Sequence, residues 1–273
     1  MKVFNKNRFG ALVCGAIVAL CPPMSLAAEG VSGADVVSHC EYKNAGTDNT
    51  SKLAIILVDK DGKERRNVYR RLWKRGDSNS DVLDKMVLYT EFPPDAKGNG
   101  FMRWGYTAES GKPADQWLYL PQSAKVRRVS VRDPGDSFLG SDLTYGDIDD
   151  RAVTADEHSL VKIDKIQGNE FYVVESVPKE SNALYSKRVS WYFKSPDWEG
   201  CYRVRTQYYD RQGALLKNAQ LSWQNKAGAW AWDKVLVENM QNGHKSLFVV
   251  TDVKFDVGLK DRLFTERALK KGL

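Results

Sequence analysis

Histidine is scarce in this chain of 273 residues, and long apolar runs are missing after its first segment. His39, His158 and His244 stand apart from one another and from other metal-ligating residue types, so the sequence does not support a zinc site. The apolar run from Phe9 to Leu20 is about a dozen residues long, too short to span a bilayer of ~30 Å. There is no Ser-, Gly- or Pro-rich linker, no low-complexity tract and no repeat of fixed period. These absences favour one globular domain over residues 28–273.

The first 27 residues are typical of a cleaved secretory signal peptide of the Sec type. A positively charged start precedes the apolar run, and Ser25, Leu26 and Ala27 provide a cleavage site with small residues. We expect cleavage after Ala27, with Ala28 as the alternative. No cysteine here follows a small residue, as lipid attachment would require. The mature protein is therefore expected to be soluble in the periplasm.

The formal net charge of the chain is too small for a strongly basic protein. The formal net charge is +6, and loss of the signal peptide leaves 38 Lys and Arg against 35 Asp and Glu, or +3. Nucleic-acid binding domains carry a clustered basic footprint and a recognisable motif. The sequence shows neither, so we expect no nucleic-acid partner.

Cysteine is equally sparse, because only Cys40 and Cys201 of the four cysteines lie outside the signal peptide. An oxidising compartment favours a disulfide between them, which would join the N-terminal helix to the sheet. Two buried, apolar thiols are the alternative, since the sequence does not give the separation of the two residues.

Most of the remaining chain has the alternating pattern of β-strands. A capping box at Ser32 and Asp35 predicts one opening helix, with Val36, Val37 and Cys40 on one face. Turn signals such as Asp-Gly and Asn-Gly then separate strands at meander spacing, which predicts a mostly antiparallel sheet of roughly a dozen strands. The predicted strands cover residues 53–58, 64–75, 86–92, 100–104, 116–120, 126–131, 158–166, 170–177, 187–194, 201–210, 214–224, 230–240 and 244–255.

Aromatic residues are abundant in these strands, and two interpretations remain open. The aromatics could fill a thick sandwich core, as they do in ordinary proteins. They could instead line an apolar cavity inside a curled sheet. Too few helices are predicted to cover a dozen strands, so either the sheet closes on itself or short helices cap a half-open barrel. The tryptophans in predicted strands are Trp73, Trp104, Trp117, Trp191, Trp223, Trp230 and Trp232.

The stretch between residues 115 and 151 is the most distinctive part of the chain. It begins with a strand that has Trp117 and Tyr119 on one face, followed by a basic strand. Phe138 and Leu139 then stand between turn residues, which indicates a loop that lies as a lid over an apolar surface and contributes little to the core. The acidic run at 147–150 is expected to be solvated charge at a helix end, because a calcium loop would need a glycine and a terminal Glu.

A catalytic site is not supported by the sequence. Gly135-Asp136-Ser137 resembles the nucleophile block of lipase-like hydrolases, but that block normally stands near the mature N-terminus. The expected Asp-x-x-His motif is also missing, since His158 follows Asp156 at the wrong spacing. The carboxylates form no visible acid and base pair. We therefore expect no enzyme activity, and a serine hydrolase remains a weak alternative.

A resemblance to a known family rests on five sequence blocks, at residues 115–121, 137–148, 209–217, 251–256 and 259–269. The first two read DQWLYLP and SFLGSDLTYGDI, on either side of the basic strand. Together the blocks resemble the LolA-like outer-membrane lipoprotein-sorting proteins, in the branch associated with large RND-type (MMPL-like) permeases.

The resemblance implies a curled antiparallel half-barrel whose short helices cap an apolar cavity. It implies a periplasmic carrier that shields the acyl chains of a lipid or lipoprotein, since each CH₂ group kept from water is worth about 0.8 kcal/mol. Its partners would be an inner-membrane RND/MMPL-type permease and an outer-membrane acceptor, with no cofactor and no metal. The alternative is a non-transporting assembly or binding subunit of an export complex. The expected cavity and lid residues are Trp73, Leu88, Phe101, Trp104, Trp117, Tyr119, Phe138, Leu139, Leu143, Tyr145, Trp191, Phe193 and Trp223.

Overall fold

The computed structural model of the chain describes residues 30–129 and 135–272. The predicted signal peptide and its cleavage site lie outside the described residues, as do the last two residues of the predicted strand 126–131. The chain divides into two units, Met1–Gly30 and Val31–Leu273, and every element named below belongs to the second. Within the described residues, no helix has both the length and the apolarity needed to cross a membrane.

All strands belong to a single antiparallel sheet with the order β6-β5-β4-β3-β2-β1-β13-β12-β11-β10-β9-β8-β7. Strands that follow one another in the sequence pair, except that β6 and β7 form the two edges of the sheet, and β1 pairs with β13 at its middle. The strands are β1 Asp48–Val58, β2 Glu64–Arg75, β3 Val82–Phe92, β4 Gly100–Tyr106, β5 Asp115–Leu120, β6 Lys125–Val129, β7 Asp156–Ile166, β8 Asn169–Pro178, β9 Lys187–Phe193, β10 Tyr202–Tyr209, β11 Leu215–Lys226, β12 Ala229–Asn239 and β13 Lys245–Phe255.

This architecture confirms the predicted fold class, which is mostly β with an open antiparallel sheet and few short helices. The two turn signals of the sequence lie where they were expected: Gly62 and Gly243 adopt φ angles of 82° and 76° in the β1–β2 and β12–β13 turns. Only glycine adopts such angles without a steric cost, so these residues fix the two hairpins.

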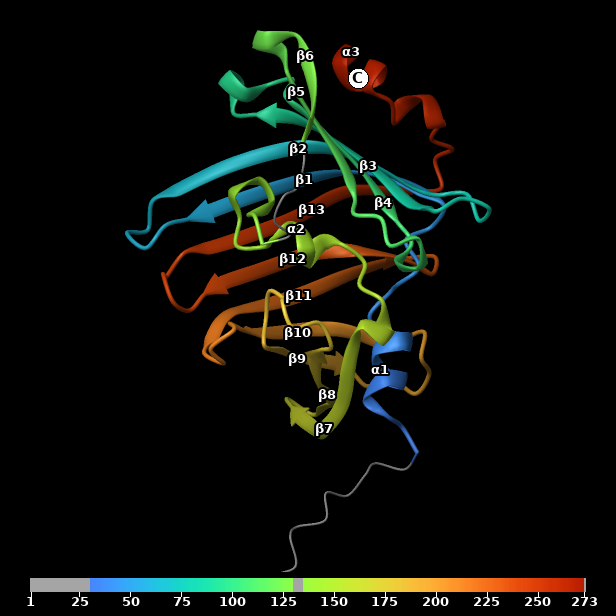
Figure 1. Cartoon of the computed structure of the whole chain (residues 1–273), viewed down its shortest axis with the longest axis vertical. Helices are drawn as coiled ribbons and strands as arrows, with labels where there is room; N and C mark the ends of the chain where they lie inside the picture. Colours follow the sequence, from blue (N-terminus) through green and yellow to red (C-terminus); the bar gives the residue numbers. More distant parts are fainter. Residues whose placement is uncertain (1–29, 130–134, 273) are drawn as a thin grey trace, which may run out of the picture. The chain divides into compact units, whose positions relative to one another are not determined.

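The two faces of the sheet are covered by different parts of the chain. Helix α1 (Gly33–Cys40) and the segment of residues 137–155 lie against one face, which we call the inner face. We call residues 137–155 the lid segment, and Figure 1 shows it crossing in front of the strands. It contains the short helices η4 (Phe138–Gly140), α2 (Tyr145–Ile148) and η5 (Val153–Ala155).

The opposite, outer face is covered at one end by the C-terminal segment, η6 (Asp261–Leu263) and α3 (Glu266–Lys271). Phe264 and Leu269 are fully buried there against Leu72, Val87 and Trp117. The three remaining short helices lie in connections between strands: η1 (Pro94–Ala96), η2 (Ala108–Ser110) and η3 (Pro121–Ser123).

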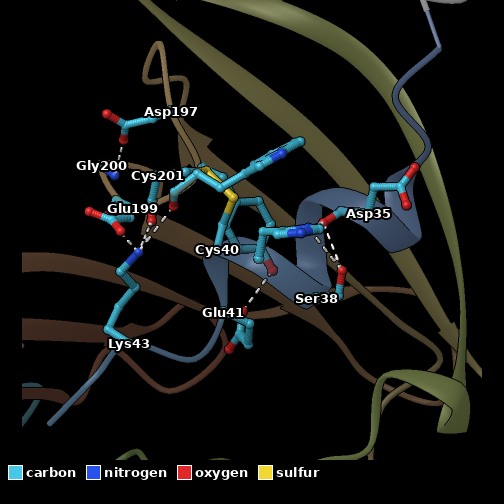
Figure 2. Close-up of a disulfide and its surroundings, with 12 residues drawn as sticks. Asp35, Ser38, Cys40, Glu41, Lys43, Asp197, Glu199, Gly200 and Cys201 are labelled. Carbon is cyan, nitrogen blue, oxygen red and sulfur yellow. Dashed lines mark hydrogen bonds between the residues drawn. A yellow bond between two sulfur atoms is a disulfide. The ribbon is translucent and has the colours of Figure 1, made fainter.

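The opening helix has the predicted cap and packs where its apolar face indicates. Ser32 accepts a hydrogen bond from the backbone of Asp35 at 3.1 Å, and the Asp35 side chain accepts one from the Ser32 backbone at 2.9 Å. Figure 2 shows the disulfide between Cys40, at the end of α1, and Cys201, next to β10. Nearby, Lys43 donates to the carbonyl of Cys201 at 2.6 Å, so the chain leaving α1 is held at two points.

Candidate functional site

The lid segment is part of the main hydrophobic core. Phe138 is only 4% exposed and Leu143 is equally buried, and both pack among side chains of the inner face. The rings of Phe138 and Phe101 meet edge-on at 6.0 Å, and Tyr145 lies 5.6 Å from Phe138 on its other side. The prediction that the Phe138 loop contributes little to the core is therefore wrong. Turn residues on both sides of Phe138 indicated a loop, but they carried no information on where its side chains point.

Eight of the thirteen expected cavity and lid residues share this inner face. Strand pairing places Trp73 opposite Met86 and Leu88 opposite Phe101, and residues that pair directly lie on one face of a sheet. The indole of Trp223 donates to the carbonyl of Arg203 at 2.7 Å and packs against the same core. The eight residues are Trp73, Leu88, Phe101, Phe138, Leu139, Leu143, Tyr145 and Trp223.

The other five expected residues lie on the outer face, so we remove them from the expected lining. Trp104, Trp117 and Tyr119 pack beneath the C-terminal segment, and the rings of the two tryptophans meet at 5.6 Å. Trp191 and Phe193 flank Tyr192 in β9, and Tyr192 packs against α1 on the inner face. Because side chains alternate along a strand, both neighbours of Tyr192 point outward. The five residues are Trp104, Trp117, Tyr119, Trp191 and Phe193.

An ion pair with almost no access to water fixes the middle of the lid segment. Asp147 of α2 lies 2.5 Å from Lys217 of β11, and the exposed fractions of the two side chains are 2% and 3%. Tyr185 donates to the same carboxylate at 2.9 Å. Burial and the neighbouring charge of Asp147 raise the pKa of Tyr185, so its hydroxyl keeps its proton and remains a donor.

A second buried cation holds the end of α2. Arg103 of β4 contacts Asp149 of the lid segment at 2.5 Å and Asp84 of β3 at 2.6 Å. Burial alone would lower the pKa of Arg103, but the carboxylates of Asp84 and Asp149 raise it above the usual value. The indole of Trp73 also donates to Asp84 at 2.9 Å, which links this expected site residue to the ionic cluster.

The third contact fixes the beginning of the lid segment to β13. The carboxylate of Asp142 accepts a hydrogen bond from Ser246 at 2.6 Å and lies 2.7 Å from the imidazole of His244. The lid segment is thus held by three carboxylates, Asp142, Asp147 and Asp149, each bound to a different strand or turn. The expectation of solvated charge at 147–150 is wrong for Asp147, whose side chain is buried, and for Asp149, which pairs with Arg103.

Lys217, Arg103 and Tyr185 were missed by the sequence analysis. Each lies in a strand or loop far along the chain from the lid carboxylates, 70 residues away in the case of Lys217 and Asp147. A single cation within a strand normally indicates an exposed edge or face. The one signal in the sequence was that Lys217 lies close to two apolar residues, Leu216 and Ala219, which would have suggested a buried position.

Acid should loosen the end of the lid segment, where Asp156 contacts both Arg151 and Arg188. Burial raises the pKa of Asp156, but the hydrogen bonds and charges of the two arginines outweigh it and lower the pKa below 3.8. A carboxyl with a lowered pKa stabilises the fold above the pKa of the unfolded state, and the contribution is lost as pH falls through the folded pKa. We expect the free energy of unfolding to decrease as the pH is lowered below about 4. Urea unfolding at pH 7 and pH 3 should show a smaller decrease in Asp156→Asn, and an equal decrease in both proteins would contradict this assignment.

The described residues contain no group of three or more His, Cys, Asp or Glu side chains placed to hold a metal ion. Ser137 bridges to Thr144 across the start of the lid segment. The lid segment contacts the inner face through apolar packing and through the ion pairs of Asp147 and Asp149.

Comparisons with known proteins place these features in context. The profile of a family described as uncharacterized proteins matches residues 83–271. A domain from Vibrio parahaemolyticus, named for outer membrane lipoprotein sorting, is 25% identical with a TM-score of 0.73 and covers 87% of this chain and 98% of its own. A DUF1329 family protein from Desulfovibrio piger is also 25% identical, with a TM-score of 0.76 and coverage of 87% and 97%.

A LolA superfamily protein from Nitrosomonas europaea shares the fold at 20% identity, with a TM-score of 0.62 and coverage of 87% of this chain and 99% of that protein. The comparison with curated protein sequences finds no match. The family profile covers more than half of the chain, and the structural matches extend over almost the whole length of their counterparts. The chain belongs to the family of uncharacterized proteins whose profile matches residues 83–271, and it shares its fold with the lipoprotein-sorting domain and the LolA superfamily protein.

Proposed function

We propose that this protein is a periplasmic carrier that holds the acyl chains of a lipid or lipoprotein between the lid segment and the inner face. The observation that supports it most is the way the lid segment is attached. Its apolar side chains cover an aromatic surface, while its position depends on three carboxylates bound to the sheet. Such ionic contacts can be exchanged for water or for another anion, so the cover can separate without unfolding the strands.

The same arrangement indicates the chemical class of the ligand. Separation of the lid segment would uncover Lys217, now paired with Asp147, and Arg103, which would lose Asp149 and keep Asp84 of β3 as its partner. An acyl chain with an anionic head group would satisfy both the apolar surface and the uncovered cations. We therefore favour fatty acids, anionic phospholipids or anionic lipoprotein lipids as cargo, delivered to or received from an RND-type permease and an outer-membrane acceptor.

A non-transporting assembly subunit is the second candidate, and one observation favours it. Phe138 and Leu143 already occupy the core of the inner face, so a ligand must first displace them. A protein whose interior is permanently filled would present its surface, and not its interior, to partners.

Tryptophan fluorescence distinguishes the two candidates. Palmitate or phosphatidylglycerol bound at the inner face should exclude water from Trp223, and its emission should shift to shorter wavelength. Trp223→Phe should reduce the shift, whereas Trp117→Phe should retain it, because Trp117 lies on the outer face beneath the C-terminal segment. Mass spectrometry of organic extracts from the purified protein should identify the cargo.

The two variants provide matched controls, because both exchange one strand tryptophan for a smaller aromatic. An emission spectrum that does not change over the whole lipid titration would remove the carrier proposal in favour of the assembly subunit. A shift that depends on Trp117 and not on Trp223 would mean that the ligand binds at the outer face, and this would contradict the proposed site.

A further inference from the structure

One corner of the sheet combines exposed apolar side chains with a surplus of cations. Strand pairing aligns Tyr89 with Gly100, Gly100 with Tyr119, and Tyr119 with Val126. The β3–β4 connection and the β5–β6 turn therefore emerge side by side at the same end of the sheet. We call this end, together with α3, the basic corner; Figure 1 shows β5, β6 and α3 near one another.

Helix α3 packs closely against this end of the sheet. Tyr89 donates a hydrogen bond to the carbonyl of Ala268 at 3.1 Å. A Cβ atom on Gly100 would lie 2.7 Å from a terminal methyl group of Leu269, so a larger residue at this position would force the Leu269 side chain to shift. A groove of about 510 Å³ runs between β6 and α3, and the two elements present their charged side chains along its two sides. The groove is lined by Ala124, Lys125, Val126, Arg127, Glu266, Arg267 and Lys270.

The basic corner holds most of the net charge of the protein. Six exposed cations carry it, and none of them forms an ion pair within the described part of the chain. Only two exposed carboxylates, Asp95 and Glu266, lie among them, so the side chains of the corner carry a charge of +4. That exceeds the +3 of the whole mature sequence, which leaves the rest of the protein close to neutral. The six cations are Lys97, Lys125, Arg127, Arg267, Lys270 and Lys271.

Two large apolar side chains are exposed at the same corner. Phe92 at the end of β3 and Leu120 at the end of β5 are each 44% exposed, and each opens one of the two neighbouring connections. The connections touch one another, since a Cβ atom on Gly98 would lie 3.4 Å from Pro121. Single apolar side chains among cations are typical of surfaces that enter the head-group region of a bilayer.

We infer that the basic corner binds the anionic lipid surface of a membrane, with its cations against the head groups and Phe92 and Leu120 among the upper acyl segments. Each Lys or Arg near such a surface contributes to the attraction, and this attraction decreases over about one Debye length from the surface. An acidic protein would satisfy the cations, but it would gain little from two isolated apolar side chains at loop ends. The inference stands apart from the proposed ligand site, because none of the residues that form the corner belongs to the hydrophobic core of the inner face.

Vesicle sedimentation of the mature protein tests this inference. We expect binding to phosphatidylcholine vesicles that contain about one third phosphatidylglycerol, little binding to pure phosphatidylcholine, and a decrease as salt rises. Reversal of three charges, Lys125→Glu, Arg127→Glu and Lys270→Glu, should weaken binding by at least about tenfold. Leu120→Ser should leave the salt dependence in place but lower the binding that remains at high salt.

A control triple with the same change of net charge lies elsewhere on the surface: Lys60→Glu, Lys234→Glu and Lys254→Glu, all exposed and without ion pairs within the described residues. It should reduce binding by no more than about twofold, since distant charges are screened. Equal losses in both triples would show that net charge alone is responsible and would overturn the inference. A wild-type protein that does not bind phosphatidylglycerol vesicles at low salt would also overturn it, and would leave an acidic protein as the partner of the corner. The fluorescence response to palmitate should be unchanged in the corner triple, so that failure here is separate from failure of the carrier proposal.

Discussion

Replacing Lys217 with methionine is expected to lower the free energy of unfolding by about 3–5 kcal/mol, or to release the lid segment at a similar cost. Methionine removes the only cation that pairs with Asp147 among the described residues, and leaves a carboxylate that is 2% exposed with the Tyr185 hydroxyl and the Thr144 backbone as its donors. Removal of one partner from a buried pair has effects of this size because the remaining charge keeps its desolvation penalty. Urea unfolding gives the total loss, and hydrogen exchange over residues 137–155 shows whether the lid segment opens first.

Two controls separate the buried pair from charge in general. Lys245→Met removes the cation of the exposed pair with Glu238 and should cost less than about 1 kcal/mol. The double variant Lys217→Met/Asp147→Leu removes both buried charges and should regain at least half of the loss. If Lys217→Met behaved like Lys245→Met, the lid segment would not depend on this ion pair.

The disulfide is expected to account for a second large part of the stability. Cys40 and Cys201 are separated by 161 residues, and a cross-link over a loop of that length restricts the unfolded chain by about 4–5 kcal/mol in the chain-entropy description. Reduction of the mature protein, or the change Cys40→Ala/Cys201→Ala, should lower its urea midpoint by a corresponding amount. Thiol titration of the denatured, unreduced mature protein should find no free thiol.

The cysteine-free variant is the control for side effects of the reductant, because its unfolding should be the same with and without it. The helix should remain in place in this variant, since Val36 and Val37 are buried against β8 and β9 independently of the cross-link. Two titratable thiols in the unreduced protein would contradict the structure at this point.

The strands could be predicted from the sequence because each one carries local information. The Asp-Gly pair at Gly62 and the Asn-Gly pair at Gly243 fixed two turns, and the capping box at Ser32 fixed the beginning of α1. Alternation also placed Trp117 and Tyr119 correctly on the same face of β5. Alternation gives no means of deciding which face is covered by which segment, and this is why both residues were expected in the wrong cluster.

The lid contacts could not be predicted because they depend on residues that meet only in the folded sheet. In the sequence, Asp147 is indistinguishable from an exposed acidic residue at a helix end, because its partner Lys217 lies in β11 and reaches it only in the folded sheet. Phe138 likewise stands between turn residues, and its burial depends on the position of Phe101 in β4. The packing of the C-terminal segment on the outer face could not be predicted for the same reason. Phe264 and Leu269 contact Trp117 only in the folded protein, where the C-terminal segment lies against the sheet.

The pairing of β1 with β13 has a consequence for the order in which the chain can fold. The strands β1–β6 and β7–β13 form two series of local hairpins, each of which can assemble as its residues become available. The two series meet only where Ala54 pairs with Val249 and its neighbours, about two hundred residues apart. Contacts of such separation form late, because a long loop must close first. While the chain is synthesised or exported from its N-terminus, the edge of β1 that pairs with β13 therefore stays unpaired until the last strand is available. An incomplete chain would expose the backbone groups of this edge to pairing with other chains.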